Sequence, residues 1–341
     1  MQSKSRQGTK GVKLLVRNCE FIKDSKKNGA FQIQHETNNA NSCILCHSNY
    51  NVYCIKKWHN YDILYCSNCQ LQFSSPMQDP GRMFYEECAI YESLSEYIQP
   101  SLPTDDWRYK TCFKFLASKP NQSLLDIGCG DGAFLAIAQN KGFTVFGIDV
   151  NTKSIIIAKN FRGLKNVVYG GWADLLKIEG WKSFDVITLF DVLEHVSSPV
   201  SLANTIFSLL SPSGTVSISV PRLDRYPPIF DQDADFPPHH FTLWTSKALN
   251  NLLTNAGFEK IRIIEKPLLA TDLLLHVTWR AKRCFRQIRK NKGHLGKEKE
   301  ISLKTSLQGV LLRLMERELL FGKGHTLLAI AKKPWMSFKN I

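Results

Sequence analysis

The chain has 341 residues, of which 43% are hydrophobic, and a formal net charge of +14. This length and composition allow one large core together with a small module, and no run of about 18 apolar residues indicates a membrane span. The first residues lack the apolar stretch of a secretory signal, so we expect a cytoplasmic, reducing compartment despite ten cysteines. Residues 1–38 are polar and basic and are predicted to form a mobile tail.

Four cysteines come next, in two pairs that are separated by nineteen residues: Cys43 and Cys46, then Cys66 and Cys69. Two residues between the members of each pair let both thiolates reach one tetrahedral ion, so residues 39–78 are predicted to form a zinc ribbon. Four thiolates fill the coordination shell, which indicates a structural Zn²⁺. A redox dithiol is the alternative, but it would not need two matched pairs. Short strands are predicted at 52–55, 61–65 and 71–73.

A glycine-rich turn follows a segment over 79–118 whose aromatic and leucine residues predict a helical lid or linker. The apolar run at 124–127 is typical of a buried parallel strand. Three glycines then stand at alternate positions: Gly128, Gly130 and Gly132. A helical pattern over 133–139 begins directly after them, so the turn lies at a helix N-terminus and is tight enough for a ligand to lie against its backbone.

Two acids give this turn its chemistry. A second strand over 144–148 ends on Asp149, whose carboxylate can accept hydrogen bonds from the hydroxyls of a ribose. A glycine turn followed about 20 residues later by an acid is the nucleoside-binding pattern of doubly wound α/β folds. Spacing alone does not exclude a dinucleotide, because Ala133 is an allowed variant of its third glycine. Asp126 discriminates better, since a carboxylate there suits a cationic ligand and would repel a pyrophosphate.

The D-x-G-x-G-x-G turn resembles that of class I S-adenosylmethionine-dependent methyltransferases, and later segments are similar to the same family. They are 183–196 (SFDVITLFDVLEHV), 209–214 (LLSPSG) and 237–245 (PPHHFTLWT), the last followed by 256–258 (AGF). With a final strand at 324–331, the matches run in order along the chain. The 237–245 segment and the cysteine layout resemble a subgroup that modifies small molecules and glycan precursors.

This resemblance implies an α/β fold with a doubly wound, seven-stranded, mostly parallel sheet of the Rossmann-like type, and a core over 119–266 and 322–335. Four residues would line the methionine part of S-adenosylmethionine: Asp126, Gly128, Gly130 and Gly132. Asp149 would bind the ribose. Asp174, after the third strand, would meet the adenine edge, with a helix N-cap as its alternative role.

The loop after the fourth strand carries Asp191, Glu194 and His195, at the carboxyl edge where open α/β sheets bind ligands. By resemblance, Asp191 borders the cofactor, while Glu194 and His195 pack and hydrogen-bond beneath it. In ubiquinone-type and small-RNA 2′-O-methyltransferases a similar pattern helps hold a divalent ion. Here Asp191, Glu194 and His195, with a histidine from 239–240, would hold Mg²⁺, although Asp191 replaces a longer Glu of the family.

A histidine is also the best candidate for a general base, because a neutral imidazole near pH 7 can take a proton. His195 is the first candidate and His240 the second. We expect one of the two to be structural, bonded to backbone near the 237–238 turn.

Residues 267–321 form a basic, apolar-striped insertion. Nine Lys or Arg stand against one Glu between Arg280 and Lys299. Such a run is typical of a solvated face. The alternative is a surface that binds anionic lipid or nucleic acid. The apolar stripe indicates core packing; an interfacial helix that brings the enzyme to a lipid-linked substrate is the alternative.

These patterns predict a methyltransferase that acts on an oxygen or carbon of a small polar acceptor, such as a sugar, a glycan precursor or a secondary metabolite. RNA 2′-O-methylation is the alternative enzyme, but the basic run lacks the interleaved aromatics of a single-strand platform. A non-catalytic scaffold, which senses the cofactor and docks a partner through the ribbon, is the third hypothesis. The intact acids and glycine turn argue against it.

Overall fold

The computed structural model describes residues 42–78, 80–81, 84, 102–116, 121–181, 183–225, 235–269 and 323–335. The predicted tail at 1–38, much of the lid at 79–118 and nearly all of the insertion at 267–321 lie outside these residues. The domain boundaries drawn from the sequence therefore stay predictions. Among the described helices, none has the length and apolar character needed to cross a membrane.

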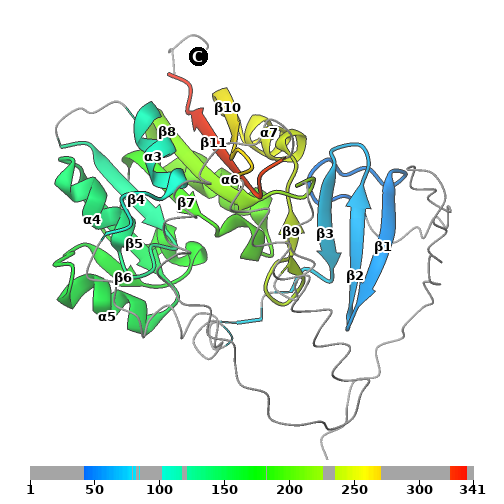
Figure 1. Cartoon of the computed structure of the whole chain (residues 1–341), viewed down its shortest axis with the longest axis horizontal. Helices are drawn as coiled ribbons and strands as arrows, with labels where there is room; N and C mark the ends of the chain where they lie inside the picture. The colour runs from blue at the N-terminus through cyan, green and yellow to red at the C-terminus, as the bar shows by residue number, and fades with distance from the viewer. Residues whose placement is uncertain are drawn as a thin grey trace, which may run out of the picture.

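Seven of the described strands form the main sheet, in the order β10-β11-β8-β7-β4-β5-β6 (Figure 1). Their bounds are β4 Ser123–Ile127, β5 Thr144–Asp149, β6 Val167–Tyr169, β7 Phe184–Phe190, β8 Leu210–Pro221, β10 Glu259–Glu265 and β11 Thr326–Lys332. Within this sheet β11 runs antiparallel to both of its neighbours, and the pairs from β6 to β8 are parallel. The predicted Rossmann-like fold is confirmed, and its strand order reverses between β4 and β7, where such sheets bind ligands.

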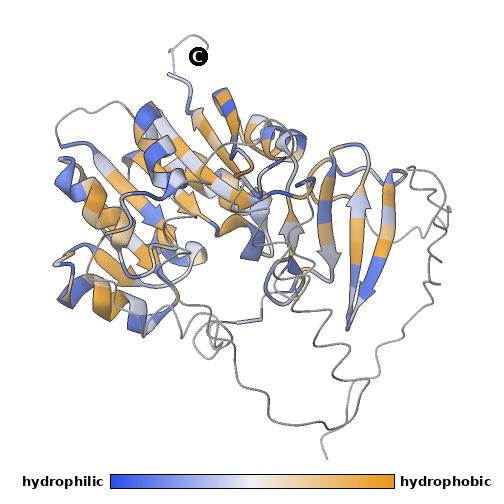
Figure 2. Cartoon of the chain, in the orientation of Figure 1, coloured by the Kyte–Doolittle hydropathy of each residue, from blue (hydrophilic) through white to orange (hydrophobic). Residues whose placement is uncertain are grey.

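Helices cover both faces of this sheet. They are α3 Trp107–Phe115, α4 Ala133–Asn140, α5 Thr152–Asn160, α6 Pro199–Leu209 and α7 Ser246–Asn255, with short 3-10 helices η1 Trp172–Lys177 and η2 Leu193–His195. The neighbouring residues Leu124 and Leu125 of β4 point to opposite faces and belong to separate buried clusters. Figure 2 shows the apolar residues along the central strands and polar residues on the helices, as burial on both faces requires.

A second, antiparallel sheet joins the cysteine-rich segment to the main domain. Its order is β1-β2-β3-β9, with β1 Val52–Trp58, β2 Tyr61–Cys66, β3 Leu71–Ser75 and β9 Thr242–Leu243. β9 lies between β8 and α7 in the chain, so the main domain contributes one strand to the ribbon sheet (Figure 1). The N–H of Ser74 also donates to the carbonyl of Phe241 at 2.9 Å. Backbone hydrogen bonds therefore fix the ribbon against this segment.

Candidate active site

The glycine turn between β4 and α4 is held by packing at two of its three positions. Gly128 and Gly132 have φ of 74° and 78°. A Cβ at Gly128 would lie 2.4 Å from Cγ2 of Val192, and one at Gly132 would lie 2.3 Å from Cδ1 of Leu164. Gly130 also has a positive φ, of 51°, but a Cβ there would meet no atom within 4 Å. Gly128 and Gly132 thus fix the turn, while Gly130 borders open space that a ligand can fill.

Asp149 ties the end of β5 to this turn. One carboxylate oxygen accepts a hydrogen bond from the N–H of Gly130 and the other from the N–H of Asn151, both at 2.8 Å. Burial raises the pKa of Asp149, and these two bonds oppose the shift. Each oxygen can accept a further bond, so the orientation of the carboxylate is set before any ligand hydroxyl reaches it.

Asp126 lies beside the turn and is 3% exposed. Its Oδ1 accepts a hydrogen bond of 2.6 Å from Oγ1 of Thr188, the residue opposite it on β7. Burial raises the pKa of Asp126 to about 7, against the effect of this bond. A carboxyl group poised in this way is driven to its charged form by a nearby cation. Thr188 was not predicted, because its role depends on the pairing of β4 with β7.

Asp174 lies in the first turn of η1, near the end of β6. Its Oδ2 accepts a hydrogen bond of 3.0 Å from the N–H of Gly171, which precedes the helix. This is a capping contact, at the third helical position rather than at the N-cap. The adenine contact expected from the family resemblance stays a prediction.

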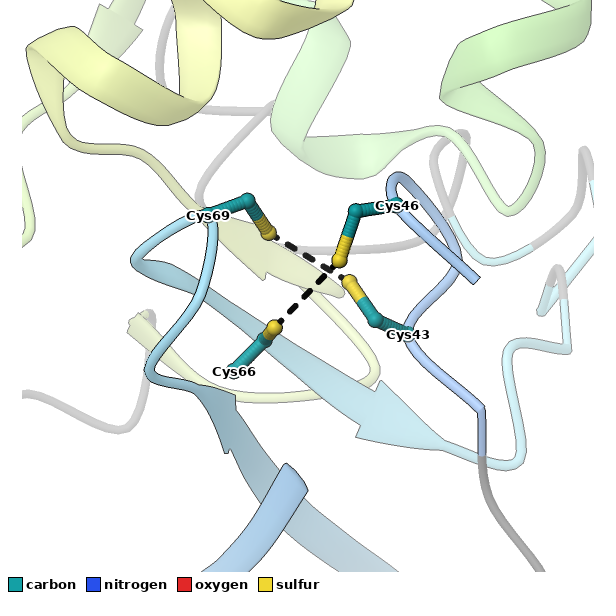
Figure 3. Close-up of side chains that lie close together, drawn as sticks. All are labelled: Cys43, Cys46, Cys66 and Cys69. Atoms are coloured by element: carbon teal, nitrogen blue, oxygen red, sulfur yellow. Dashed lines mark hydrogen bonds between the residues drawn. The ribbon is translucent and has the colours of Figure 1, made fainter. Parts of the chain in front are cut away.

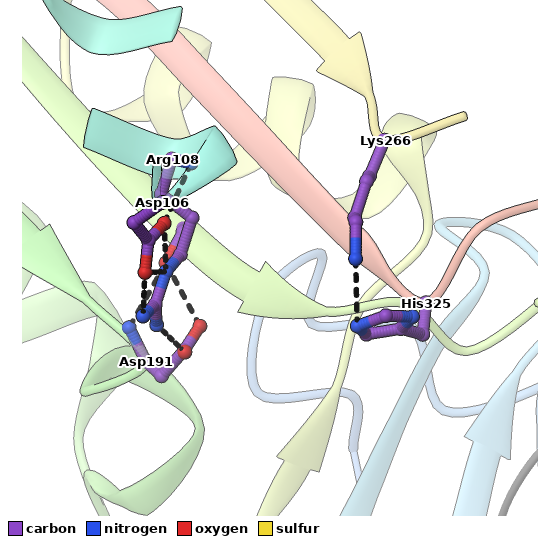
Figure 4. A network of polar contacts seen from close by, with 6 residues as sticks. Asp106, Arg108, Asp191, Lys266 and His325 are labelled. Atoms are coloured by element: carbon purple, nitrogen blue, oxygen red, sulfur yellow. Dashed lines mark hydrogen bonds and ion pairs between the residues drawn. The ribbon is translucent and has the colours of Figure 1, made fainter. Parts of the chain in front are cut away.

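Asp191 follows β7 and has a φ of 56°. Its Oδ1 accepts a hydrogen bond of 2.8 Å from Oγ of Ser219, and its Oδ2 accepts one from Nη1 of Arg108 (Figure 4). Arg108 comes from α3 and also binds Asp106, through Nε at 3.0 Å and Nη2 at 2.6 Å. Arg108 has no local sequence signal, since its contact with Asp191 spans 83 positions.

Glu194, His195 and His240 form a second group, in which one ligand atom from each lies within 4.8 Å of the others. Glu194 is fully buried, and neither of its carboxylate oxygens has a hydrogen-bond partner among the described residues. Burial, and then the charge of Asp191, raise the pKa of Glu194 well above its usual value. An unpartnered buried carboxyl is costly, so it is protonated or meets a cation there.

The donor set of this group could hold a divalent ion, and the predicted Mg²⁺ stays a prediction. One carboxylate oxygen and two imidazole nitrogens suit Zn²⁺, Mn²⁺, Fe²⁺ or Co²⁺, whereas Mg²⁺ prefers oxygen ligands. Asp191, which we expected among the ligands, is instead engaged by Arg108 and Ser219. His240 is the histidine of the 239–240 pair that lies in the group.

The two histidines differ in their surroundings, although their rings are only 4.7 Å apart. Nδ1 of His195 donates to the carbonyl of His239 at 2.7 Å, the backbone contact expected of a structural histidine, and leaves Nε2 as an acceptor. Burial lowers the pKa of His195 to about 4 and that of His240 to about 2, so both are neutral at pH 7. His240 lines the pocket described next.

A pocket of about 540 Å³ lies beside Asp191. It is lined by Asp106, Trp107, Arg108, Asp191, Pro221, Arg225, Asp235, His240, Lys266, His325 and Thr326. The lining combines residues from α3, from the ends of β7 and β8, and from the start of β11. This volume suits a small organic ligand. The residues at its β11 side, Lys266 and His325, were not predicted.

The four predicted cysteine ligands converge (Figure 3). The Sγ atoms of Cys43 and Cys69 are 3.4 Å apart, those of Cys46 and Cys66 are 3.6 Å apart, and all four lie within 4.8 Å of one another. Tetrahedral Zn–S bonds of about 2.3 Å place sulfur atoms roughly 3.8 Å apart. The set therefore fits a closed zinc site.

Comparison with known proteins agrees with this architecture. Residues 106–263 match the family model described as "Methyltransferase domain". The ubiquinone biosynthesis O-methyltransferase of Paracidovorax citrulli is 35% identical over 108 residues, which cover 30% of this chain and 45% of that protein. The protein of the same name from Caulobacter sp. is 34% identical over 99 residues, covering 28% and 39%. The chain thus spans less than half the length of these curated relatives.

A solved structure shows the same fold. Phosphoethanolamine N-methyltransferase 2 of Haemonchus contortus, in complex with S-adenosyl-L-methionine, superposes with a TM-score of 0.50 at 18% identity. The superposition covers 74% of this chain and 60% of that chain. Residues 106–263 thus match a methyltransferase domain, and the strand order and the superposition agree with the fold of S-adenosylmethionine-dependent methyltransferases.

Proposed function

We propose that this protein transfers a methyl group from S-adenosylmethionine to an oxygen of a small polar acceptor, such as a sugar or a glycan precursor. The observation that carries this proposal is the position of the loop after β7, where Val192 packs against the glycine turn at Gly128 and the preceding residue, Asp191, lines the pocket of about 540 Å³. The O-methyltransferase names of the relatives support oxygen as the atom methylated.

The geometry of the turn supports the cofactor roles that we propose for its residues. The cofactor supplies a methyl group that is bound to a cationic sulfonium. After the transfer, the sulfur remains on the cofactor product as a neutral thioether. Asp126 offers a buried carboxyl to the cationic methionine part, next to the open space at Gly130. We assign Asp149, whose carboxylate is held by the N–H of Gly130, to accept hydrogen bonds from the ribose hydroxyls. We assign Asp174, near the end of β6, to the adenine edge.

We assign the general base to His240 and a positioning role to His195. His240 lines the pocket, and its Nδ1 has no hydrogen-bond partner among the described residues. A neutral imidazole in this place can take the proton of an acceptor hydroxyl as the new bond to carbon forms. His195 packs edge-on against it and is fixed by the carbonyl of His239.

A titration of S-adenosylhomocysteine into the purified protein tests the proposal. We expect micromolar affinity that is lost in Asp149→Ala, with no binding of NAD. Lys153→Ala, an exposed position at the start of α5, serves as the matched control and keeps the wild-type affinity. A folded, metal-loaded protein that does not bind S-adenosylhomocysteine would refute the proposal.

A divalent ion at Glu194, His195 and His240 is a second candidate for activating the acceptor hydroxyl, by lowering its pKa. The unpartnered carboxylate of Glu194 supports it. Visible absorption of added Co²⁺ tests it, with a ligand-field band expected in the wild type and absent in Glu194→Gln. The same band in both proteins would instead assign the Co²⁺ to the cysteines.

A further inference from the structure

The pocket has two ends with different electrostatics (Figure 4). At the cofactor end, Arg108 binds the carboxylates of Asp106 and Asp191. At the other end, Lys266 follows β10 and His325 precedes β11. The ammonium of Lys266 donates to Nε2 of His325 at 3.4 Å.

At the cofactor end the one guanidinium of Arg108 is paired with two carboxylates, and Arg225 is paired with Asp235. Lys266 differs. Among the described residues no carboxylate lies within 4 Å of its Nζ. The acid next to it in sequence, Glu265, is held by Arg222 at 2.6 Å and by Ser246 at 2.9 Å.

The other nearby acid is also occupied. Asp224 accepts a hydrogen bond of 2.8 Å from Nε of Arg222 and a further one from Lys323. Arg222 is 2% exposed, so it holds both acids from within the core. Lys266 therefore presents an uncompensated positive charge to the pocket.

The backbone around Lys266 and His325 is fixed. The N–H of Lys266 donates to the carbonyl of Thr326 at 2.9 Å, and the N–H of Arg222 donates to that of His325 at 2.8 Å. A Cβ at Gly324 would lie 2.1 Å from the carbonyl oxygen of Lys266, so only glycine allows this approach. Both side chains thus start from rigid strand ends, which is how a binding site is preorganised.

We propose that Lys266, with His325, binds an anionic group of the methyl acceptor, a phosphate or a carboxylate. This deepens the proposed function and rests on it. The ammonium has three donors and gives one to His325, so two remain for an anion. A neutral acceptor would leave the charge of Lys266 unmatched in the bound pocket. The acceptor class is a small hydroxyl compound that carries its anion at the end opposite the methylated oxygen, such as a sugar phosphate or a sugar acid.

Calorimetric titration of inorganic phosphate and of acetate tests this site, with and without saturating S-adenosylhomocysteine. We expect at least one anion to bind to the wild type, and a loss of at least tenfold in affinity in Lys266→Met. Lys266→Arg keeps the charge and most of the affinity. Lys260→Met, on the strand β10 that Lys266 follows, has a side chain that is 73% exposed; it is the matched control and changes nothing. The tighter anion identifies the group that the acceptor carries.

Equal anion affinity in the wild type and in Lys266→Met, or no anion binding by the wild type, would overturn the proposal. Lys266→Gln, which keeps a polar side chain without the charge, replaces Lys266→Met if that variant does not fold. Binding of S-adenosylhomocysteine is measured in every variant and should stay within twofold of the wild type. If the wild type does not bind S-adenosylhomocysteine, the proposed function is refuted. The anion site is still tested in that case, because the anions are also titrated in the absence of S-adenosylhomocysteine.

Discussion

Replacing Asp126 by Asn should stabilise the cofactor-free protein at neutral pH while weakening cofactor binding. The folded protein keeps this carboxyl protonated up to about pH 7, whereas the unfolded chain loses the proton near pH 3.9. The folded state therefore binds more protons between these values, and the free energy of unfolding falls as the pH rises through this window. About three pKa units correspond to about 4 kcal/mol. Asn cannot titrate, and its amide oxygen can still accept the hydrogen bond of Thr188.

Urea unfolding of both proteins at pH 4, 6 and 8 measures this effect. The stability of Asp126→Asn relative to the wild type should grow by about 4 kcal/mol from pH 4 to pH 8, as an order of magnitude. Asp105→Asn, at an exposed carboxylate, should show no such growth. In the same variant, affinity for S-adenosylhomocysteine should fall at least tenfold, because its ammonium loses an anionic partner. A stability difference that stays flat with pH, or that favours the wild type at pH 8, would show that Asp126 is ionised in the folded protein and refute the reasoning.

Three further changes separate structural roles from binding roles. In Gly132→Ala the new Cβ would lie 2.3 Å from Leu164 at a left-handed φ, so urea unfolding should show that the free energy of unfolding falls by about 2 to 4 kcal/mol. Gly130→Ala should lose less stability but more affinity for S-adenosylhomocysteine. The reverse order of the two variants would contradict the roles assigned to these glycines. Trp58→Phe removes a hydrogen bond of 2.9 Å to the carbonyl of Pro237 and should lower the free energy of unfolding by about 1 kcal/mol; an unchanged value would show that this contact is not formed in solution. Mass spectrometry should find one zinc ion per chain, and removal of this ion by a chelator should lower the melting temperature. A protein that contains no zinc, or whose melting temperature does not change, would contradict a structural zinc ion in the ribbon.

The sequence was sufficient for features that lie within short segments. The apolar run before Gly128 and the acid at the end of the next strand predicted two paired parallel strands, and β4 and β5 pair in that register. The cysteine spacing predicted a cluster that the structure shows as four converging Sγ atoms. In each case the residues lie within one short segment at a regular spacing, so one sequence carries the signal.

The remaining site residues depend on contacts between distant segments. Thr188 reaches Asp126 through the pairing of β4 with β7, 62 positions apart. Arg108 reaches Asp191 from α3. Lys266 and His325 meet because β10 pairs with β11, with the insertion between them in the chain. None of these residues has a distinctive local pattern, and their roles appear only when strand order and register are known.

The ribbon sheet and the pocket share one segment of the chain. Residues 235–243 provide Asp235 and His240 to the pocket and then form β9 in the ribbon sheet. The indole of Trp58 donates to the carbonyl of Pro237 and stacks on Phe236 at 4.8 Å, so β1 also holds this segment. A loop of this length would sample many conformations on its own. Because the ribbon holds this segment through β9 and through Trp58, we expect that folding of the cysteine-rich module helps to place His240 in the pocket.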